Sequence, residues 1–221
     1  MNKKSLVIVL VVLIVGFGAY YIKQNQAPVV FDPLNATYIL DDQPVTLTNG
    51  KSEVSAAPGS ATEITTTIFG EPVTGDLNSD GKPDAAIILV DNPGGTGTFY
   101  FVAAAINTHK GAQGTNAVLL GDRIAPQNIQ IKNGQIIANY TDRGPDDPMS
   151  VPPSIGVSKY LVFDGTGLKS SPPISGAGER CGGNMKTTPI CITDYHCTPN
   201  PNSDLPFGDV GGTCVLDVNQ N

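Results

Sequence analysis

Two uninterrupted apolar runs near the middle of the chain constrain its fold more than any other feature. They cover residues 85–90 and 99–106, and the glycine-rich loop DNPGGTGT lies between them. Short continuous apolar runs bounded by turn residues are typical of central strands that are buried on both faces. The alanines at 103–105 would also suit a helix, but the flanking Phe, Tyr and Val favour a strand.

The rest of the middle region also favours strands joined by turns. The chain contains 25 Gly and 18 Pro among 221 residues, and only 15% of its residues are charged. Asn49-Gly50 and Asn133-Gly134 each separate apolar-alternating runs, which is the pattern of a hairpin closed by a type I′ turn. We therefore expect residues 27–168 to form an all-β, mostly antiparallel domain, built either as a single blade-like sheet or as a sandwich.

The first 26 residues carry the signs of a membrane anchor. Lys3 and Lys4 precede an uncharged run over residues 5–22, which is long enough to cross a bilayer as a helix. The positive-inside rule places the two lysines in the cytoplasm and the rest of the chain outside. We therefore expect a single-pass protein of the cell membrane. The alternative is a cleaved signal peptide and a secreted protein, and both interpretations export the remaining residues.

All four cysteines of the chain lie in its last fifth. They are Cys181, Cys191, Cys197 and Cys214. An even number of cysteines in an exported segment rich in Gly and Pro predicts two disulfides. A zinc site would instead need paired C-x-x-C spacing or spaced histidines, and only His196 lies nearby. We expect a disulfide-stapled tail over residues 181–217, joined to the β domain by a linker over residues 169–180.

The stretch GDLNSDGKPD at residues 75–84 has the spacing of a calcium-binding loop. The predicted ligands fall at alternate positions and are Asp76, Asn78, Asp80, Lys82 through its backbone carbonyl, and Asp84. Alternate oxygens of a tight turn converge on one point, as a hard cation requires, and Gly81 permits the sharp turn. The sequence therefore predicts a structural Ca²⁺. The alternative is a turn rich in Asp and Asn that holds no metal.

The same residues resemble the calcium loop of the FG-GAP repeat. That repeat combines the pattern D-x-[DN]-x-D-G-x-x-D with a following strand, and residues 76–84 match the pattern. A true EF-hand needs a glutamate at the twelfth position, where this chain has Ile87, and the cellulosomal dockerin loop is a more distant likeness. The FG-GAP resemblance implies a structural calcium ion. Because the motif occurs once, it does not imply a propeller.

A longer resemblance runs through most of the middle region. The stretches GDLNSDGKPDAA, GTGTFYF, LLGDRI and GPDDPM occur in this order, as they do in a group of exported bacterial proteins. The resemblance implies that residues 37–163 form one domain outside the membrane. It implies no activity.

The tail resembles the fungal cellulose-binding module, a small disulfide-stapled β unit. The resemblance rests on the opening C-G-G and on the spacing C-x9-C-x5-C-x16-C. That module pairs its first cysteine with the third and its second with the fourth, which here implies the pairs Cys181–Cys197 and Cys191–Cys214. It binds sugar through a row of aromatic residues, whereas this tail carries only Tyr195 and Phe207. From the spacing alone the pairing stays open.

Charge and motifs limit the function. A net charge of −7 argues against nucleic acid as a partner, because an acidic chain repels phosphate. The sequence contains no recognisable nucleophile motif, and its two Asp-Arg pairs, at residues 122–123 and 142–143, suit loop-fixing salt bridges better than acid–base catalysis. We therefore expect a non-catalytic, calcium-stabilised module that binds a protein or a glycan outside the membrane. The alternative is a cell-envelope hydrolase or hydrolase inhibitor whose site is built from scattered carboxylates.

Overall fold

The computed structural model describes residues 30–183, 188–200 and 211–217, which contain strands, turns and one short 3-10 turn, η1 (Pro33–Asn35). The expected all-β class is confirmed. The chain divides into two compact units, Met1–Val30 and Phe31–Asn221, and every element described below belongs to the second. Within the described residues, no helix has the length and hydropathy that crossing a bilayer requires. The expected membrane segment at residues 5–22 lies outside the described residues.

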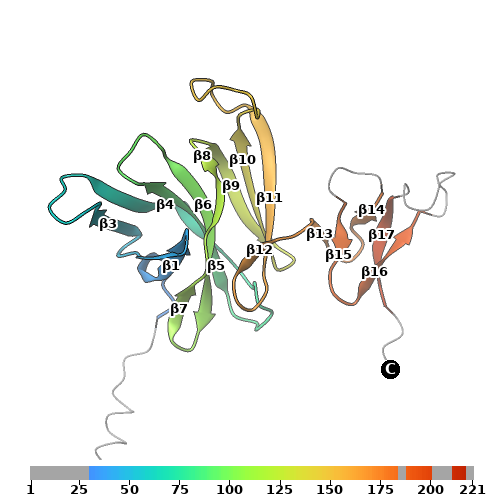
Figure 1. Ribbon diagram of the computed structural model, residues 1–221. Coiled ribbons are helices and arrows are strands. Elements are labelled where there is room, and N and C mark those ends of the chain that lie inside the picture. Colours follow the sequence, from blue (N-terminus) through green and yellow to red (C-terminus); the bar gives the residue numbers. More distant parts are fainter. Residues whose placement is uncertain (1–29, 184–187, 201–210, 218–221) are drawn as a thin grey trace, which may run out of the picture. The chain divides into compact units, whose positions relative to one another are not determined.

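The largest sheet is antiparallel and has the strand order β3–β4–β5–β6–β7, with β8 paired to β6 (Figure 1). Its strands are β3 (Lys51–Ser55), β4 (Glu63–Gly75), β5 (Asp84–Asn92), β6 (Phe99–Thr108), β7 (Gly111–Gly114) and β8 (Val118–Asp122). The central strands β5 and β6 contain the two apolar runs and pair with each other from Ala85 opposite Ala105 to Asp91 opposite Phe99. The prediction of two central strands is therefore confirmed.

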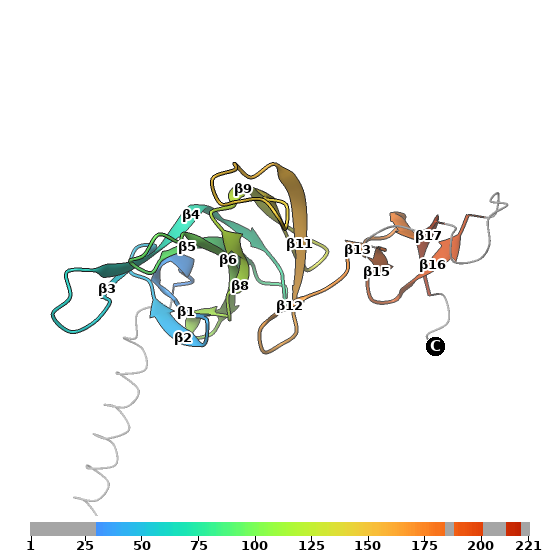
Figure 2. The ribbon, with the colours of Figure 1, turned by 45° about the horizontal axis from the view of Figure 1, so that its top comes forward.

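A second antiparallel sheet has the strand order β12–β11–β10–β9. Its strands are β9 (Ala125–Lys132), β10 (Gln135–Asp142), β11 (Ile155–Phe163) and β12 (Leu168–Ser170). A separate hairpin consists of β1 (Thr37–Leu40) and β2 (Gln43–Thr46). Figure 2 shows β5 and β6 between this hairpin and the second sheet. Of the two expected architectures, the structure has the sandwich, with the hairpin added on its other side.

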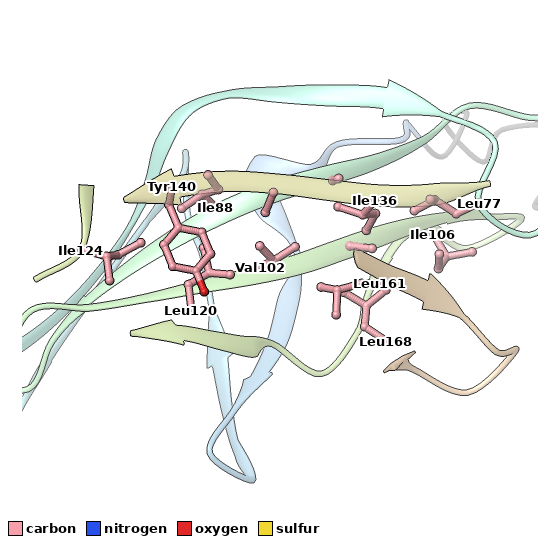
Figure 3. Packing of buried hydrophobic residues seen from close by; sticks show 13 residues of the cluster. Leu77, Ile88, Val102, Ile106, Leu120, Ile124, Ile136, Tyr140, Leu161 and Leu168 are labelled. Carbon is pink, nitrogen blue, oxygen red and sulfur yellow. The ribbon is translucent and has the colours of Figure 1, made fainter. Parts of the chain in front are cut away.

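The side chains of β5 and β6 alternate between two separate apolar clusters. On the sheet-covered face, Ala86, Ile88 and Val102 pack against the second sheet, including Ile136 and Leu161 (Figure 3). On the hairpin-covered face, the cluster comprises Ala85, Ile87, Leu89, Phe101, Ala103 and Ala105 with Tyr38 and Leu40 of β1. Successive residues of a strand point to opposite faces, so continuous apolar sequence is what burial on both faces requires.

The predicted turn at Asn133-Gly134 closes the β9–β10 hairpin. Lys132 pairs with Gln135, and the two turn residues have φ values of 52° and 69°. Positive φ at both positions is the mark of a type I′ turn, which explains why Asn and Gly stand there.

The turn at Asn49-Gly50 also forms, but it does not join a pair of hydrogen-bonded strands. Its residues have φ values of 50° and 79°, and Thr48 and Lys51 exchange backbone hydrogen bonds across it. Beyond this bridge β2 pairs with β1, whereas β3 pairs with β4. The two strands therefore diverge after the turn, because each is bound to a different partner.

The cysteine-rich tail consists of two small sheets and two disulfides. Its strands are β13 (Ile174–Ser175), β14 (Arg180–Gly182), β15 (Ile190–Cys191), β16 (Tyr195–Pro199) and β17 (Gly211–Leu216). Strands β13 and β15 are parallel, and β14, β17 and β16 form an antiparallel sheet. Cys181 is bonded to Cys197 and Cys191 to Cys214, which is the pairing implied by the resemblance to the fungal module. The predicted disulfide-stapled tail is confirmed.

The segment at residues 169–180, expected as a linker, contains the end of β12 and all of β13. Gln135, which is 1% exposed, fixes this segment to the start of β10. Its amide nitrogen donates to the Pro172 carbonyl at 2.8 Å, and its amide oxygen accepts from the Ile174 N–H at 3.0 Å. A buried amide that satisfies both of its groups holds the backbone in one position.

Candidate metal centre

The predicted calcium loop connects β4 to β5, at one end of the central sheet. Leu77 is 5% exposed and anchors the loop in the cluster of the sheet-covered face. At the loop entrance, a Cβ on Gly75 would lie 2.6 Å from Ile131 Cγ2, so only glycine lets β4 pass this close to β9. Ser79 and Gly81 have positive φ values of 62° and 77°, which give the turn its tight curvature.

Asp76 organises the outer part of this loop. Its Oδ1 accepts from the N–H of Asn78 (3.3 Å) and of Ser79 (2.7 Å), and its Oδ2 accepts from the N–H of Gly81 (2.9 Å). Backbone N–H groups stabilise a carboxylate, and the Gly81 N–H contributes most to holding the pKa of Asp76 below its usual value. This side chain is therefore charged and held in a fixed position at neutral pH.

Asn78 and Asp80 extend the same pattern along the turn. Asn78 Oδ1 accepts from the Asp80 N–H at 3.0 Å, and Asp80 Oδ1 accepts from the Lys82 N–H at 2.9 Å. The Lys82 ammonium lies 3.6 Å from Asp80 Oδ2, and the two side chains are 56% and 34% exposed. An exposed ion pair of this kind contributes little to stability, so it does not prevent Asp80 from binding a cation.

Asp84 lies beneath the loop instead of within it. It is fully buried, with Oδ2 accepting from the Leu77 N–H at 2.9 Å and Oδ1 from the Asn107 N–H at 2.8 Å. The Asn107 side chain donates in turn to the Pro83 carbonyl at 3.1 Å. These bonds join the loop to the end of β6, so in this structure Asp84 fixes the loop to the sheet.

The donor set fits a calcium ion in its outer part. Asp76, Asn78, Asp80 and the Lys82 carbonyl supply the oxygen ligands that calcium prefers, on consecutive alternate positions of one turn. Among the described residues, the carboxylates of Asp76, Asp80 and Asp84 do not form a group whose oxygens all lie within 4.8 Å of one another. Asp84 lies apart from the first four, because its two oxygens bond to the backbone N–H groups of Leu77 and Asn107 beneath the loop.

A second group of charged residues meets at the ends of β8 and β10. Arg123 binds the Asp122 carboxylate at 2.9 Å, and Asp122 also accepts from the Thr98 N–H at 2.9 Å. Arg143 Nη1 donates to the Arg123 carbonyl at 3.0 Å, and its Nε donates to the Val151 carbonyl at 2.5 Å. The two Asp-Arg pairs of the sequence thus come together and fix loops. The expected salt bridge forms between Asp122 and Arg123, whereas Arg143 acts through backbone carbonyls and, among the described ion pairs, makes none with Asp142.

The electrostatics of this group agree with that role. Hydrogen bonds from Arg123 are the largest cause that holds the pKa of Asp122 below its usual value, and the nearby Arg143 adds to the effect. In the neighbouring proline-rich loop, Asp147 Oδ2 accepts from the Gly144 N–H at 2.8 Å and closes a local turn. These carboxylates therefore hold backbone in place.

Sequence reasoning missed one row of polar side chains in the tail. His196 Nδ1 lies 2.5 Å from Asp217 Oδ1, and His196 Nε2 lies 3.1 Å from the Thr198 hydroxyl. His196 and Thr198 stand two residues apart on β16 and so share a face, which is a signal that could have linked them. The side chains of His196 and Asp217 are 56% and 40% exposed, so the row lies on the surface.

The cysteines do not form a metal site. The sulfur atoms of Cys181, Cys191 and Cys214 lie within 4.8 Å of one another, but all three belong to disulfides. The sulfur of a disulfide is not a thiolate, which is the form of cysteine that binds zinc.

Comparisons with known proteins do not assign the chain to a family. A scan against models of protein families, a search of curated proteins and a search of solved structures each found no match.

Proposed function

We propose that this chain is a non-catalytic, calcium-stabilised module that is anchored in the cell membrane and binds a protein or a glycan outside it. One observation carries the proposal: the charged motifs of the β domain are engaged in holding loops. Asp84, Asp122 and Arg143 each bond to backbone groups of a neighbouring loop. A catalytic acid or base must instead reach a substrate proton.

The tail supports the location outside the cell. It contains two disulfides. Disulfides persist in oxidising compartments and are rare in the cytosol. The anchor itself rests on the sequence, in which Lys3 and Lys4 precede the apolar run over residues 5–22.

Calcium would be held by Asp76, Asn78, Asp80 and the carbonyl of Lys82, with Asp84 supporting the turn from beneath. The ion would offset the negative charges that the loop gathers and would fix the entry into β5. Its role would be structural, because the loop packs on the core through Leu77.

Thermal unfolding of the full chain in detergent tests the calcium component. Millimolar calcium is expected to raise the melting temperature over that in EGTA, since a ligand that binds only the folded state stabilises it. Asp80→Ala should abolish this rise. Asp146→Ala, in an exposed loop away from the motif, should leave it intact. Equal melting temperatures in EGTA and in millimolar calcium would exclude a structural calcium ion.

A glycan array and a panel of envelope hydrolase substrates test the binding role. We expect retention of a ligand and no turnover. The alternative, a hydrolase or hydrolase inhibitor, has the row of Thr198, His196 and Asp217 in its favour, because it places a hydroxyl, an imidazole and a carboxylate in sequence. The alternative would be established if the chain turned over a substrate and if this turnover were lost in His196→Ala or in an Asp-to-Asn variant outside the calcium loop.

A further inference from the structure

A groove of about 510 Å³ lies on the hairpin-covered face of the central sheet. One wall is formed by β2, and the floor includes Val54 of β3 with Ile64 and Thr66 of β4. The groove exists because β2 and β3 diverge after the Asn49-Gly50 turn, so that the hairpin does not cover this part of the sheet. Val54 is 54% exposed as a result.

The β2 edge that borders this groove carries backbone groups without a neighbouring strand. Among the described strands, β2 pairs only with β1. Leu40 and Gln43 flank the two-residue turn of the hairpin, so the backbone groups of Pro44 and Thr46 point away from β1. Ile39, opposite Pro44, shows the same alternation, since it bonds outward, to the Thr115 carbonyl (3.0 Å) and the Ala117 N–H (2.7 Å).

The available edge accepts more hydrogen bonds than it donates. Pro44 has a carbonyl but no N–H, whereas Thr46 offers both groups. An extended segment laid along β2 could bond to these groups in the manner of strand addition to a sheet edge. Its alternate side chains would then point to the apolar floor.

The charged residues that line the groove indicate that its occupant carries a positive charge. Of the described lining residues, Asp41 and Asp91 are the charged ones, and none is Lys, Arg or His. Asp91 Oδ1 accepts from the Thr66 hydroxyl at 2.7 Å, which fixes the carboxylate at the groove. A cationic side chain would find an oriented partner there.

Aromatic side chains are absent from the described lining residues, which argues against a sugar as the occupant. Sugar-binding surfaces present flat aromatic rings, whereas this groove presents aliphatic side chains, hydroxyls and carboxylates. Its chemistry suits the side chains of a peptide.

We propose that this groove binds an extended peptide segment in which a Lys or Arg and apolar residues occupy alternate positions, so that their side chains share the face toward the groove. The segment adds to the free edge of β2, places apolar side chains against Val54 and Ile64, and pairs its cation with Asp91. This proposal rests on the proposed function of a non-catalytic binding module and names the chemistry of its partner.

Fluorescence anisotropy on the full chain in detergent tests the proposal. The probe is a fluorescein-labelled peptide of sequence Thr-Val-Thr-Lys-Thr-Val, in which the two Val and the Lys share one face of an extended strand. The comparison peptide has Glu in place of Lys. We expect the Lys peptide to bind at least about tenfold more tightly than the Glu peptide and to weaken as salt rises. Equal affinities of the two peptides would overturn the proposal.

Two variants locate the site. Asp91→Asn retains an acceptor for Thr66 and should weaken Lys-peptide binding by about tenfold. Val54→Lys should abolish binding, because it fills the groove with a like charge. Val215→Lys is the matched control, since Val215 is also an exposed strand valine, at 44%, but lies in the tail. Binding that survives Val54→Lys would show that the peptide binds elsewhere and would overturn the proposal.

The outcomes separate this proposal from the proposed function. A glycan that binds and is lost in Val54→Lys would replace the peptide as occupant and leave the binding role standing. Ligand binding that neither variant affects would remove the groove proposal alone. Substrate turnover would remove the proposed function itself.

Discussion

One face of β5 and β6 is covered by a four-stranded sheet, whereas the other is covered by a two-stranded hairpin. Both covers bury the side chains in the middle of these strands: Ile87 is 0% exposed beneath the hairpin, and Ile88 is 3% exposed beneath the sheet. The covers differ at the end near β3 and β4. There the hairpin-covered face opens into the groove, and Val54 and Ile64 lie at its floor.

The two aspartates at the ends of β5 show what this difference means. Asp84 belongs to the sheet-covered face, is fully buried and accepts two backbone hydrogen bonds. Asp91 belongs to the hairpin-covered face and lines the groove. The more completely covered face uses its carboxylate to hold the fold. The less completely covered face leaves its carboxylate within reach of a partner.

The largest effects are expected from cutting back the core on each face. Ile87→Ala and Ile88→Ala should each lower the free energy of unfolding by about 2 to 5 kcal/mol, because both leave a cavity in packed surroundings. Urea titration followed by circular dichroism measures both values. A cost below about 1 kcal/mol for Ile87→Ala alone would show that the hairpin is not a true cover of its face.

A smaller effect should separate the two aspartates. Asp84→Ala is expected to cost about 2 to 4 kcal/mol, because the N–H groups of Leu77 and Asn107 lose their acceptor. Asp91→Ala should cost less, about 1 kcal/mol, because it removes one side-chain hydrogen bond, from the Thr66 hydroxyl, and leaves the backbone bonds in place. The same urea titration measures both losses in the free energy of unfolding. Similar losses for the two variants would contradict the proposed difference between the two faces.

The smallest effect concerns acid stability. The pKa of Asp122 is lowered in the folded chain, chiefly by hydrogen bonds from Arg123, so its contribution is present above the ordinary carboxyl pKa. That contribution is lost as the pH falls through the lowered value, below about pH 4. Melting curves from pH 7 to pH 2 should show a shallower acid decline for Asp122→Asn, by less than about 1 kcal/mol. An unchanged slope would mean that Arg123 does not stabilise this carboxylate.

Local patterns in the sequence predicted much of the β domain. Continuous apolar residues at 85–90 and 99–106 indicated burial on both faces, because a strand alternates its side chains. Asn133-Gly134 indicated its hairpin, because few other residues accept positive φ at two successive positions. Both signals depend only on neighbours in the chain.

Other features depend on contacts between distant residues and left no such signal. Nothing near Asn49-Gly50 shows that β2 pairs with β1 while β3 pairs with β4, although this divergence creates the groove. The meeting of Arg143 with the loop at Arg123 is equally invisible in the sequence. In the predicted calcium loop, the spacing identified the turn, but the position of Asp84 beneath it follows from its bond to Asn107 on β6.

The central claim is that the hairpin-covered face carries the binding site. Its most direct test is a two-dimensional NMR titration of the isotope-labelled chain with the peptide Thr-Val-Thr-Lys-Thr-Val. The account predicts that the largest amide shifts fall on Thr46, Val54, Ile64 and Asp91, around the groove. Shifts concentrated on the second sheet, at β9 to β12, or spread evenly over the chain, would contradict it.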